Sequence, residues 1–353
     1  MSGEDAFLGA LTLAIIACGS AAAWCLAAWR AREGAGAAWP KVLFGTLVTA
    51  LCLGMVLLGL EVFYRFVYDA TDSFALAKTS QRWFARHYQE NSWHVRDDVD
   101  YQDARTSGRR RVTFLGDSFT NGHGVADVDQ RFANRLRAMH PEWDVQVLAR
   151  DGLDTGAELT LLTRKLTEGY QTDDLVLVYC LNDIGDLIPE WRRTVDALYA
   201  EQAAAGFLVR NSYAINFLSL RWRSRSSPEI AGYYPQLVAA YASARWQVQS
   251  TRLRRLATLT AAHGIRLWVV TFPFLQLLGP DYPFRVAHER LDALWPALGV
   301  AHLDLLPVFA GRPPESLAVN RYDPHPNETA HALAAQAIDE LLRAPAGKDR
   351  PRE

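Results

Sequence analysis

Two long apolar runs open the chain. Residues 6–29 and 42–60 contain no charged side chain, and a helix needs about 20 apolar residues to cross the core of a bilayer. Aromatic residues lie toward the ends of both runs, as they do at membrane interfaces: Trp24, Trp29, Trp39, Phe63, Tyr64 and Tyr68. The pattern predicts a membrane anchor over 1–66, with transmembrane helices at about 6–29 and 42–66.

Three other readings of these runs stay open. A cleaved signal peptide needs a basic start, whereas this chain begins with Glu4 and Asp5. The stretch that ends at Cys18 loosely suggests a lipoprotein signal, but the sequence after it stays apolar through Trp29. The third reading is a buried helical hairpin of a soluble protein, although two such charge-free runs would be unusual there.

Charge around the loop between the runs predicts the topology. This stretch contains three basic residues, Arg30, Arg32 and Lys41, and a single acidic one, Glu33. Loops rich in Lys and Arg stay in the cytoplasm. Both termini and the large C-terminal part are therefore expected on the extracytoplasmic, or periplasmic, side.

Beyond the anchor, residues 67–110 are expected to form a neck helix and a polar connection. From 111 onward, short β-branched runs alternate with helical patterns, which predicts a parallel sheet covered on both faces. The expected strands are 111–115, 144–148, 174–180, 265–271 and 300–305. The expected helices are at about 130–139, 157–168, 236–262 and 328–343. This places a domain at 111–343, with a helical insertion at about 187–262 that is a candidate lid and a disordered tail at 344–353.

Composition narrows the class of protein. The chain has 353 residues, a formal net charge of −2 and 22% charged residues, so neither a mostly disordered chain nor a nucleic-acid partner is expected. Cys180 is the one cysteine outside the apolar runs, so the main domain has no partner for an internal disulfide. No Cys/His cluster has the spacing of metal ligands, and we expect no metal and no cofactor.

A serine follows the first expected strand, in Gly116-Asp117-Ser118-Phe119-Thr120. A sharp strand-to-helix turn is where α/β proteins expose a nucleophile. The same residues would also suit a plain turn that favours small side chains. A phosphate-binding loop is a weaker reading, because neither G-x-G-x-x-G nor G-K-[ST] follows.

Further polar positions fall at the ends of later elements. Gly152 follows the second expected strand, and Asn182 with Asp183 follows the third. Before the last helix, Asp323 precedes His325 by two residues, so a carboxylate there could orient the imidazole. Active sites of parallel sheets form at the carboxyl ends of strands, which is where these residues are expected.

Together these blocks resemble the SGNH (GDSL) hydrolase family over about residues 91–343. The resemblance implies a flavodoxin-like, three-layer α/β/α domain with about five parallel strands, and ester chemistry without a cofactor. It implies Ser118 as nucleophile, His325 as base and Asp323 as the acid that orients it. The oxyanion would be bound by the Ser118 and Gly152 backbone N–H groups and by the Asn182 side chain.

This sequence also departs from the family pattern. Asp323 stands two residues before His325, where the family commonly has three. Val147 replaces a frequent Asn, Leu181 a frequent Gly, and His94 stands where anchored relatives often have Gly. Asp117 and Asp183 are expected to brace the active-site loops by hydrogen bonds, as are Thr120, Thr155 and His123.

The leading hypothesis is a membrane-anchored serine esterase that acts outside the cytoplasm on acyl esters, with O-acetyl groups of an envelope glycan as a candidate substrate. An O-acyltransferase would use the same acyl-enzyme and deliver the group to a sugar hydroxyl. A third class is a binding or scaffold protein on an inactive hydrolase fold, which the complete set of site residues disfavours. The expected partners are an ester substrate, which a carbohydrate could carry, and the lipid bilayer.

Overall fold

The computed structural model describes residues 2–31 and 39–344. The chain divides into two compact units. Unit 1 consists of Met1–Ala70, Ala75–Trp83 and Leu198–Ser227, and unit 2 of Thr71–Phe74, Phe84–Ala197 and Pro228–Glu353. Arg32 and Glu33 of the predicted basic loop, and residues 345–353 of the predicted tail, lie outside the described residues.

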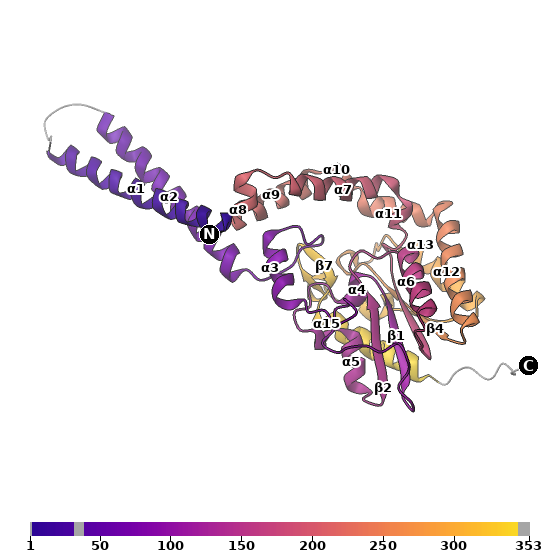
Figure 1. Cartoon of the computed structure of the whole chain (residues 1–353). Helices are drawn as coiled ribbons and strands as arrows, with labels where there is room; N and C mark the ends of the chain where they lie inside the picture. Colours follow the sequence, from indigo (N-terminus) through magenta and orange to yellow (C-terminus); the bar gives the residue numbers. More distant parts are fainter. Residues whose placement is uncertain (1, 32–38, 345–353) are drawn as a thin grey trace, which may run out of the picture. The chain divides into compact units, whose positions relative to one another are not determined.

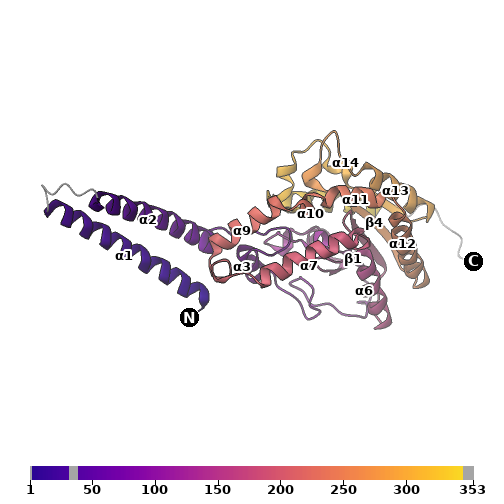
Figure 2. The same cartoon turned by 90° about the horizontal axis from the view of Figure 1, so that it is seen from above.

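Unit 1 contains the two apolar runs as an antiparallel helical hairpin, visible in Figure 2. Helix α1 spans Gly3–Ala31, and α2 spans Trp39–Val62 and continues as a π-helical turn, Phe63–Val67. The most apolar windows have mean hydropathies of 2.0 and 2.3, and 11% and 0% of their residues are buried. Helices of this length and composition occur as membrane spans and, near an N-terminus, as signal sequences. The low burial distinguishes both from the core helix of a soluble protein.

The rest of unit 1 packs beside the end of the hairpin where α1 begins and α2 ends. It comprises the first part of α3 (Lys78–His87), the end of α7 (Pro189–Ala203), α8 (Phe207–Asn211) and α9 (Tyr213–Ser226). The Phe217 ring of α9 stacks on Tyr64, with 4.3 Å between ring centroids. Part of the predicted insertion therefore belongs to the same compact unit as the apolar helices.

Unit 2 is built on a parallel five-stranded sheet in the order β2-β1-β3-β4-β5. The strands are β1 (Arg110–Gly116), β2 (Trp143–Ala149), β3 (Asp174–Cys180), β4 (Arg266–Phe272) and β5 (Ala301–Asp304). Every residue of β3 is buried, as expected for a strand covered on both faces. The observed order is the flavodoxin-like one, which confirms the predicted fold class and its five strands.

Helices cover both faces of the sheet, as Figure 1 shows. On one face, α5 (Phe132–Met139) packs against α15 (Glu328–Arg343), where the Phe132 N–H donates to His331 Nδ1 at 3.3 Å. On the other, α6 (Thr155–Thr167) meets α12 (Arg245–Ala262), where Gln249 Nε2 donates to Thr155 Oγ1 at 2.7 Å. The hydrophobic core lies between these layers and the sheet.

Two local features differ from the sequence prediction. The helical pattern predicted at 236–262 is two helices, α11 (Tyr233–Tyr241) and α12, because Ser243 Oγ donates to the Ala240 carbonyl and supports a turn between them. The segment before the last helix forms an antiparallel pair, β6 (Ala318–Asn320) and β7 (Asp323–Pro326). Two prolines in β7 make a strand hard to predict there.

Short helical elements complete the chain: α4 (Ser118–Asn121), α10 (Pro228–Ala231), α13 (Arg285–Ala297), α14 (Leu306–Phe309), and the 3₁₀ turns Val128–Gln130, Gly185–Leu187, Leu275–Leu277 and Pro314–Ser316.

Candidate active site

The strand order brings three of the predicted site segments to one edge of the sheet. Strand β1 lies between β2 and β3, and its last residue, Gly116, pairs with Ala149 and Val178. Ser118, Gly152 and Asn182 follow these three strands directly. The carboxyl ends of adjacent parallel strands thus hold the predicted nucleophile and the predicted oxyanion groups together.

Ser118 is the first residue of α4 and is 6% exposed. Asp117 caps this short helix by accepting a hydrogen bond from the Phe119 N–H at 2.9 Å. A Cβ atom at Gly116 would lie 2.9 Å from Thr120 Cβ and 3.0 Å from the Val178 carbonyl oxygen. Glycine is therefore required for the chain to turn this tightly from strand to helix.

His325 and Asp323 reach the serine from β7. His325 Nε2 lies 2.8 Å from Ser118 Oγ, and His325 Nδ1 lies 2.5 Å from Asp323 Oδ1. The His325 backbone N–H also donates to Asp323 Oδ1, at 3.2 Å. The carboxylate two residues before the histidine thus sits where a triad acid is needed.

Asp323 is fully buried and remains anionic because of its neighbours. Burial alone would raise its pKa, but the charges of His325 and His123, with hydrogen bonds from both, hold the pKa of Asp323 well below its usual value. The Thr71 hydroxyl donates to the other oxygen, Oδ2. Both oxygens of the carboxylate are therefore engaged.

The other predicted oxyanion groups occupy the neighbouring loops. Asn182 Nδ2 donates to Asp117 Oδ2 at 3.2 Å, which links the loop after β3 to the residue beside Ser118. Gly152 follows β2 with a φ of +80°, a conformation that favours glycine. Its neighbour Asp151 accepts a hydrogen bond from Asn121 Nδ2 of α4 at 2.6 Å.

Asp117, next to Ser118 in the sequence, belongs to a group of buried acids. Burial raises the pKa of Asp117 to about 6. Burial, and then repulsion by neighbouring carboxylates that include Asp117, raise the pKa values of Asp183 and Glu158 well above normal. Among the described residues the carboxyl oxygens of Asp183 and Glu158 have no hydrogen-bond partner. Asp183 was expected to brace its loop by hydrogen bonds, and these are not found for its side chain in the described part of the chain. Glu158 was not predicted, because one glutamate in an amphipathic helix carries no sign of burial.

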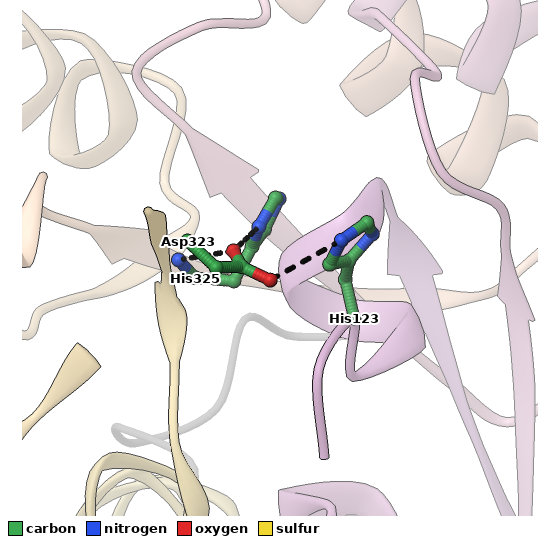
Figure 3. A group of neighbouring side chains, drawn as sticks. All are labelled: His123, Asp323 and His325. Carbon is green, nitrogen blue, oxygen red and sulfur yellow. Dashed lines mark hydrogen bonds and ion pairs between the residues drawn. The ribbon is translucent and has the colours of Figure 1, made fainter. Parts of the chain in front are cut away.

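The largest departure from the sequence prediction concerns His123, which was expected only to brace a loop. Its ring stacks on that of His325, with 4.1 Å between centroids and 22° between planes. In Figure 3, dashed lines join the Asp323 carboxylate to both histidines, one oxygen to His325 and the other to His123. Nothing in the sequence around His123 indicates this position. Of the two threonines expected to brace loops by hydrogen bonds, Thr155 accepts one from Gln249 Nε2, whereas Thr120 Oγ1 has no partner among the described residues.

His123, Asp323 and His325 also form the kind of set that can hold a metal ion, with ligand atoms all within 4.8 Å of one another. In this geometry the two ring nitrogens of His325 are hydrogen-bonded to Asp323 and Ser118. A metal ion would have to break those bonds, so the arrangement suits proton transfer better than metal binding.

A separate apolar pocket of about 470 Å³ lies in unit 2. It is lined mainly by two loops, Leu278–Tyr282 and Leu306–Gly311, and none of the predicted site residues lines it.

The sequence matches no protein-family model and no curated protein. The structure is similar to several solved ones. They include an extracellular lipase from Streptomyces rimosus (14% identity, 66% of this chain and 99% of that chain, TM-score 0.44). An acetylxylan esterase, Axe2 from Geobacillus stearothermophilus, is similar at 13% identity over 70% and 100% of the two chains, with a TM-score of 0.42. The esterase EstA from a Pseudoalteromonas species is 15% identical over 66% and 97%, with a TM-score of 0.39. At these identities, function has to be argued from the site itself.

Proposed function

We propose that this chain is a serine hydrolase of acyl esters, with Ser118 as nucleophile, His325 as general base and Asp323 as the orienting acid. The observation that carries the proposal is the continuous hydrogen-bonded path from Ser118 Oγ to His325 Nε2, at 2.8 Å, and from His325 Nδ1 to Asp323, at 2.5 Å. The resemblance of the sequence blocks to SGNH hydrolases supports the same roles.

The reaction would proceed through an acyl-enzyme. His325 takes the proton of Ser118 as the oxygen attacks the ester carbonyl, and it returns that proton to the leaving alcohol. Water then attacks the acyl-enzyme by the same route in reverse, which releases the acid. Asp323 holds the Nδ1–H tautomer of His325 and stabilises the imidazolium formed in each half-reaction.

The negative charge that develops on the carbonyl oxygen needs donors. We assign the backbone N–H groups of Ser118 and Gly152 and the side-chain amide of Asn182. Asn182 Nδ2 carries two hydrogens, and Asp117 accepts one of them, so this carboxylate fixes the direction of the other. Loss of one oxyanion donor costs about 10²–10³-fold in turnover, which is the loss expected for Asn182→Ala.

We further propose that α1 and α2 span a membrane and that the catalytic unit lies outside the cytoplasm, with O-acetyl esters of an envelope glycan as the substrate class. Support comes from the apolar, little-buried hairpin and from the basic residues between its helices. A reporter fused after Arg343 is expected to be active only on the extracytoplasmic side. Activity in the cytoplasm would reverse the topology and remove the reason for an envelope substrate.

The catalytic proposal is tested with the purified full-length chain in detergent. A fluorophosphonate probe should label Ser118, and 4-nitrophenyl esters from acetate to octanoate should be hydrolysed, with Ser118→Ala as the matched control. Activity should be the same after treatment with EDTA. Adding a glycan acceptor separates hydrolysis from transfer, because a transferase would form acylated glycan in place of free acid. Labelling of Ser118→Ala at the wild-type level would contradict the assignment.

A further inference from the structure

His123 contacts more of the catalytic machinery than a loop-bracing residue needs to. The side chain is 3% exposed, and its Nδ1 lies 2.6 Å from Asp151 Oδ2. Its Nε2 lies 3.1 Å from the Asp72 carbonyl oxygen and 3.4 Å from Asp323 Oδ2. Both ring nitrogens therefore face oxygen atoms that can only accept hydrogen bonds.

This environment requires a charged ring. A neutral imidazole has one N–H and could satisfy acceptors on one side only, whereas an imidazolium donates from both nitrogens. Burial opposes the charge, but the negative charge of Asp323 and the hydrogen bond to Asp151 raise the pKa of His123 well above its usual value. Burial would also raise the pKa of Asp151, but the hydrogen bond and charge of His123 lower it.

We propose that His123 is a positioning residue of the active site: an imidazolium that holds the second oxygen of Asp323 while the first faces His325. The inference rests on the proposed function. With Thr71 and His123 on Oδ2 and the backbone and ring of His325 on Oδ1, the carboxylate has one orientation. A residue on a distant loop, His123, thus helps to hold Asp323 in place, although Asp323 stands only two residues before His325.

The charge of His123 lies beside the catalytic base, because its ring stacks on that of His325. The other charged groups around this pair are Asp323 and Asp151, with Asp117 near His325. On the side of α3 the neighbour of His123 is the Phe84 ring, and the Arg96 guanidinium donates to the Gly122 and Val125 carbonyls on either side of it.

The test is His123→Gln, which keeps a donor but removes the charge. We expect kcat to fall with KM nearly unchanged, because Asp323 loses one of the groups that hold it and orients His325 less well, while the ester binds as before. His140→Gln is the matched control. That histidine also pairs with a carboxylate, Asp339 at 2.5 Å, and stacks on Trp143, but it lies before β2, at the opposite edge of the sheet. Its kcat and KM should both stay at wild-type values. A loss of kcat/KM in His123→Gln that comes from a higher KM, or that accompanies a lower melting temperature, would mean a structural role only.

A second readout needs no substrate. In the ¹⁵N NMR spectrum of the wild-type chain at pH 8, both nitrogens of His123 should be protonated, with the signals assigned by their loss in His123→Gln. A neutral His123 would overturn the inference even if the enzyme is active. A charged His123 in a chain that hydrolyses no ester would instead count against the proposed function.

A different observation, in unit 1, points to a lipid-facing surface. Glu61 directly follows the second apolar run and is fully buried. Its carboxylate accepts hydrogen bonds from Ser212 Oγ at 2.6 Å and from the Tyr213 and Ala214 N–H groups at 3.0 Å each. It thus caps the N-terminus of α9 and fixes that helix beside the end of α2.

The helices held there expose apolar and basic side chains. On α8, Phe207 is 57% and Leu208 is 53% exposed. On α9, Leu218 and Trp222, one turn apart, are 49% and 76% exposed. Helix α9 carries Arg221, Arg223 and Arg225 and no acidic residue. Arg225 is exposed, whereas Arg223 pairs with Glu201 at 3.0 Å and the Arg221 guanidinium lies over the Phe217 ring. We propose that α8 and α9 lie in the membrane interface, with these apolar side chains in the bilayer surface and Arg225 near lipid phosphates. Continuity with the apolar hairpin selects a bilayer as the occupant; the inference rests on the proposed span.

Brominated lipids, which quench nearby tryptophans, test this surface. The full chain is placed in nanodiscs of phosphatidylcholine and phosphatidylglycerol, with or without bromine on the upper acyl chain. Because the chain has 11 tryptophans, the signal of each is taken as the difference from its Trp→Phe variant. The Trp222 signal should be quenched, as should that of Trp24 in α1, while that of buried Trp143 should not. Quenching at Trp24 but not Trp222 would overturn the lipid-facing surface, and no quenching at Trp24 would overturn the span itself.

Discussion

Ser118 and His325 are joined by a single hydrogen bond of 2.8 Å, so each is of little use without the other. Ser118→Ala and His325→Ala should each lower kcat by on the order of 10⁴-fold or more, and the double variant should be little worse than either. Asp323→Ala should retain more activity, because Asp323 orients the base and does not react. Steady-state hydrolysis by the wild type and the four purified variants measures this. Turnover at the wild-type rate by Ser118→Ala would refute the proposed mechanism.

Asp117 provides a test through pH. Its pKa in the folded chain is raised to about 6 by burial, from an ordinary value of 3.8. The folded state therefore binds the proton more tightly than the unfolded state, and this residue lowers stability as pH rises from about 4 to about 6. At about 1.4 kcal/mol per pH unit, the loss reaches at most roughly 3 kcal/mol. Asp117→Asn cannot ionise, so its melting temperature should rise relative to wild type over that range. Parallel melting curves from pH 4 to 6.5 would contradict the assigned ionisation.

The site residues that could be predicted from the sequence differ physically from those that could not. Ser118 and His325 stand in short local blocks that resemble those of SGNH hydrolases, so the sequence alone predicted them, and the structure brings them together. His123 and Asp151 are 28 residues apart on separate loops. Their pairing, and the contact of His123 with Asp323, depends on how those loops pack, which no local pattern reports. The roles of all these residues remain predictions.

At the scale of elements, the strands of the sheet could be predicted because burial on both faces leaves near-continuous apolar runs. Strand β7 could not be, because Asp-Pro-His-Pro has neither alternation nor apolar content. Its conformation is set by pairing with β6 and by the groups around Asp323. The element that carries the acid and the base is thus the one whose structure is least evident locally.

The polar connection before β1 is fastened by one buried carboxylate. Asp97 accepts hydrogen bonds from Arg137 of α5 at 2.7 and 3.0 Å, from Arg131 at 3.1 Å and from Asn134 at 3.1 Å. Burial would raise its pKa, but the hydrogen bond and charge of Arg137 and the charge of Arg131 hold the pKa of Asp97 well below its usual value. Its contribution to stability is therefore present at neutral pH and is lost as pH falls below about 4.

Asp97→Asn should destabilise the fold by about 3–5 kcal/mol at pH 7, because it leaves buried arginines without their counter-charge. Urea unfolding followed by circular dichroism measures the change, and the gap to wild type should narrow at pH 3. Asp98→Asn is the control, since that side chain is 48% exposed and its nearest contact to Arg137 is 3.7 Å. Equal stability of the two variants would show that Asp97 does not hold this segment.

At the scale of the whole molecule, the sequence predicted successive domains, whereas the compact units interleave. Residues 198–227 lie within the predicted insertion but belong to the unit of the apolar helices. One contact that joins these segments is made by Glu61, a single glutamate after an apolar run. Its partners lie about 150 residues later in the sequence. A pattern read along the chain cannot reveal a contact of that range.

This interleaving changes what removal of the anchor should do. The core of unit 2, as far as the chain is described, includes no residue from 1–70 or 198–227, so a chain of residues 71–353 should still fold and melt cooperatively. Helix α9, however, would lose the Glu61 cap and the Tyr64 ring that packs on Phe217. Residues 198–227 should therefore be cleaved by protease much faster than in the full chain, while the rest resists. Full-length Glu61→Gln is the matched control: it keeps the hairpin but weakens the charged cap, and its cleavage rate should fall between the two. Equal protection of 198–227 in all three proteins would show that this segment does not depend on the anchor.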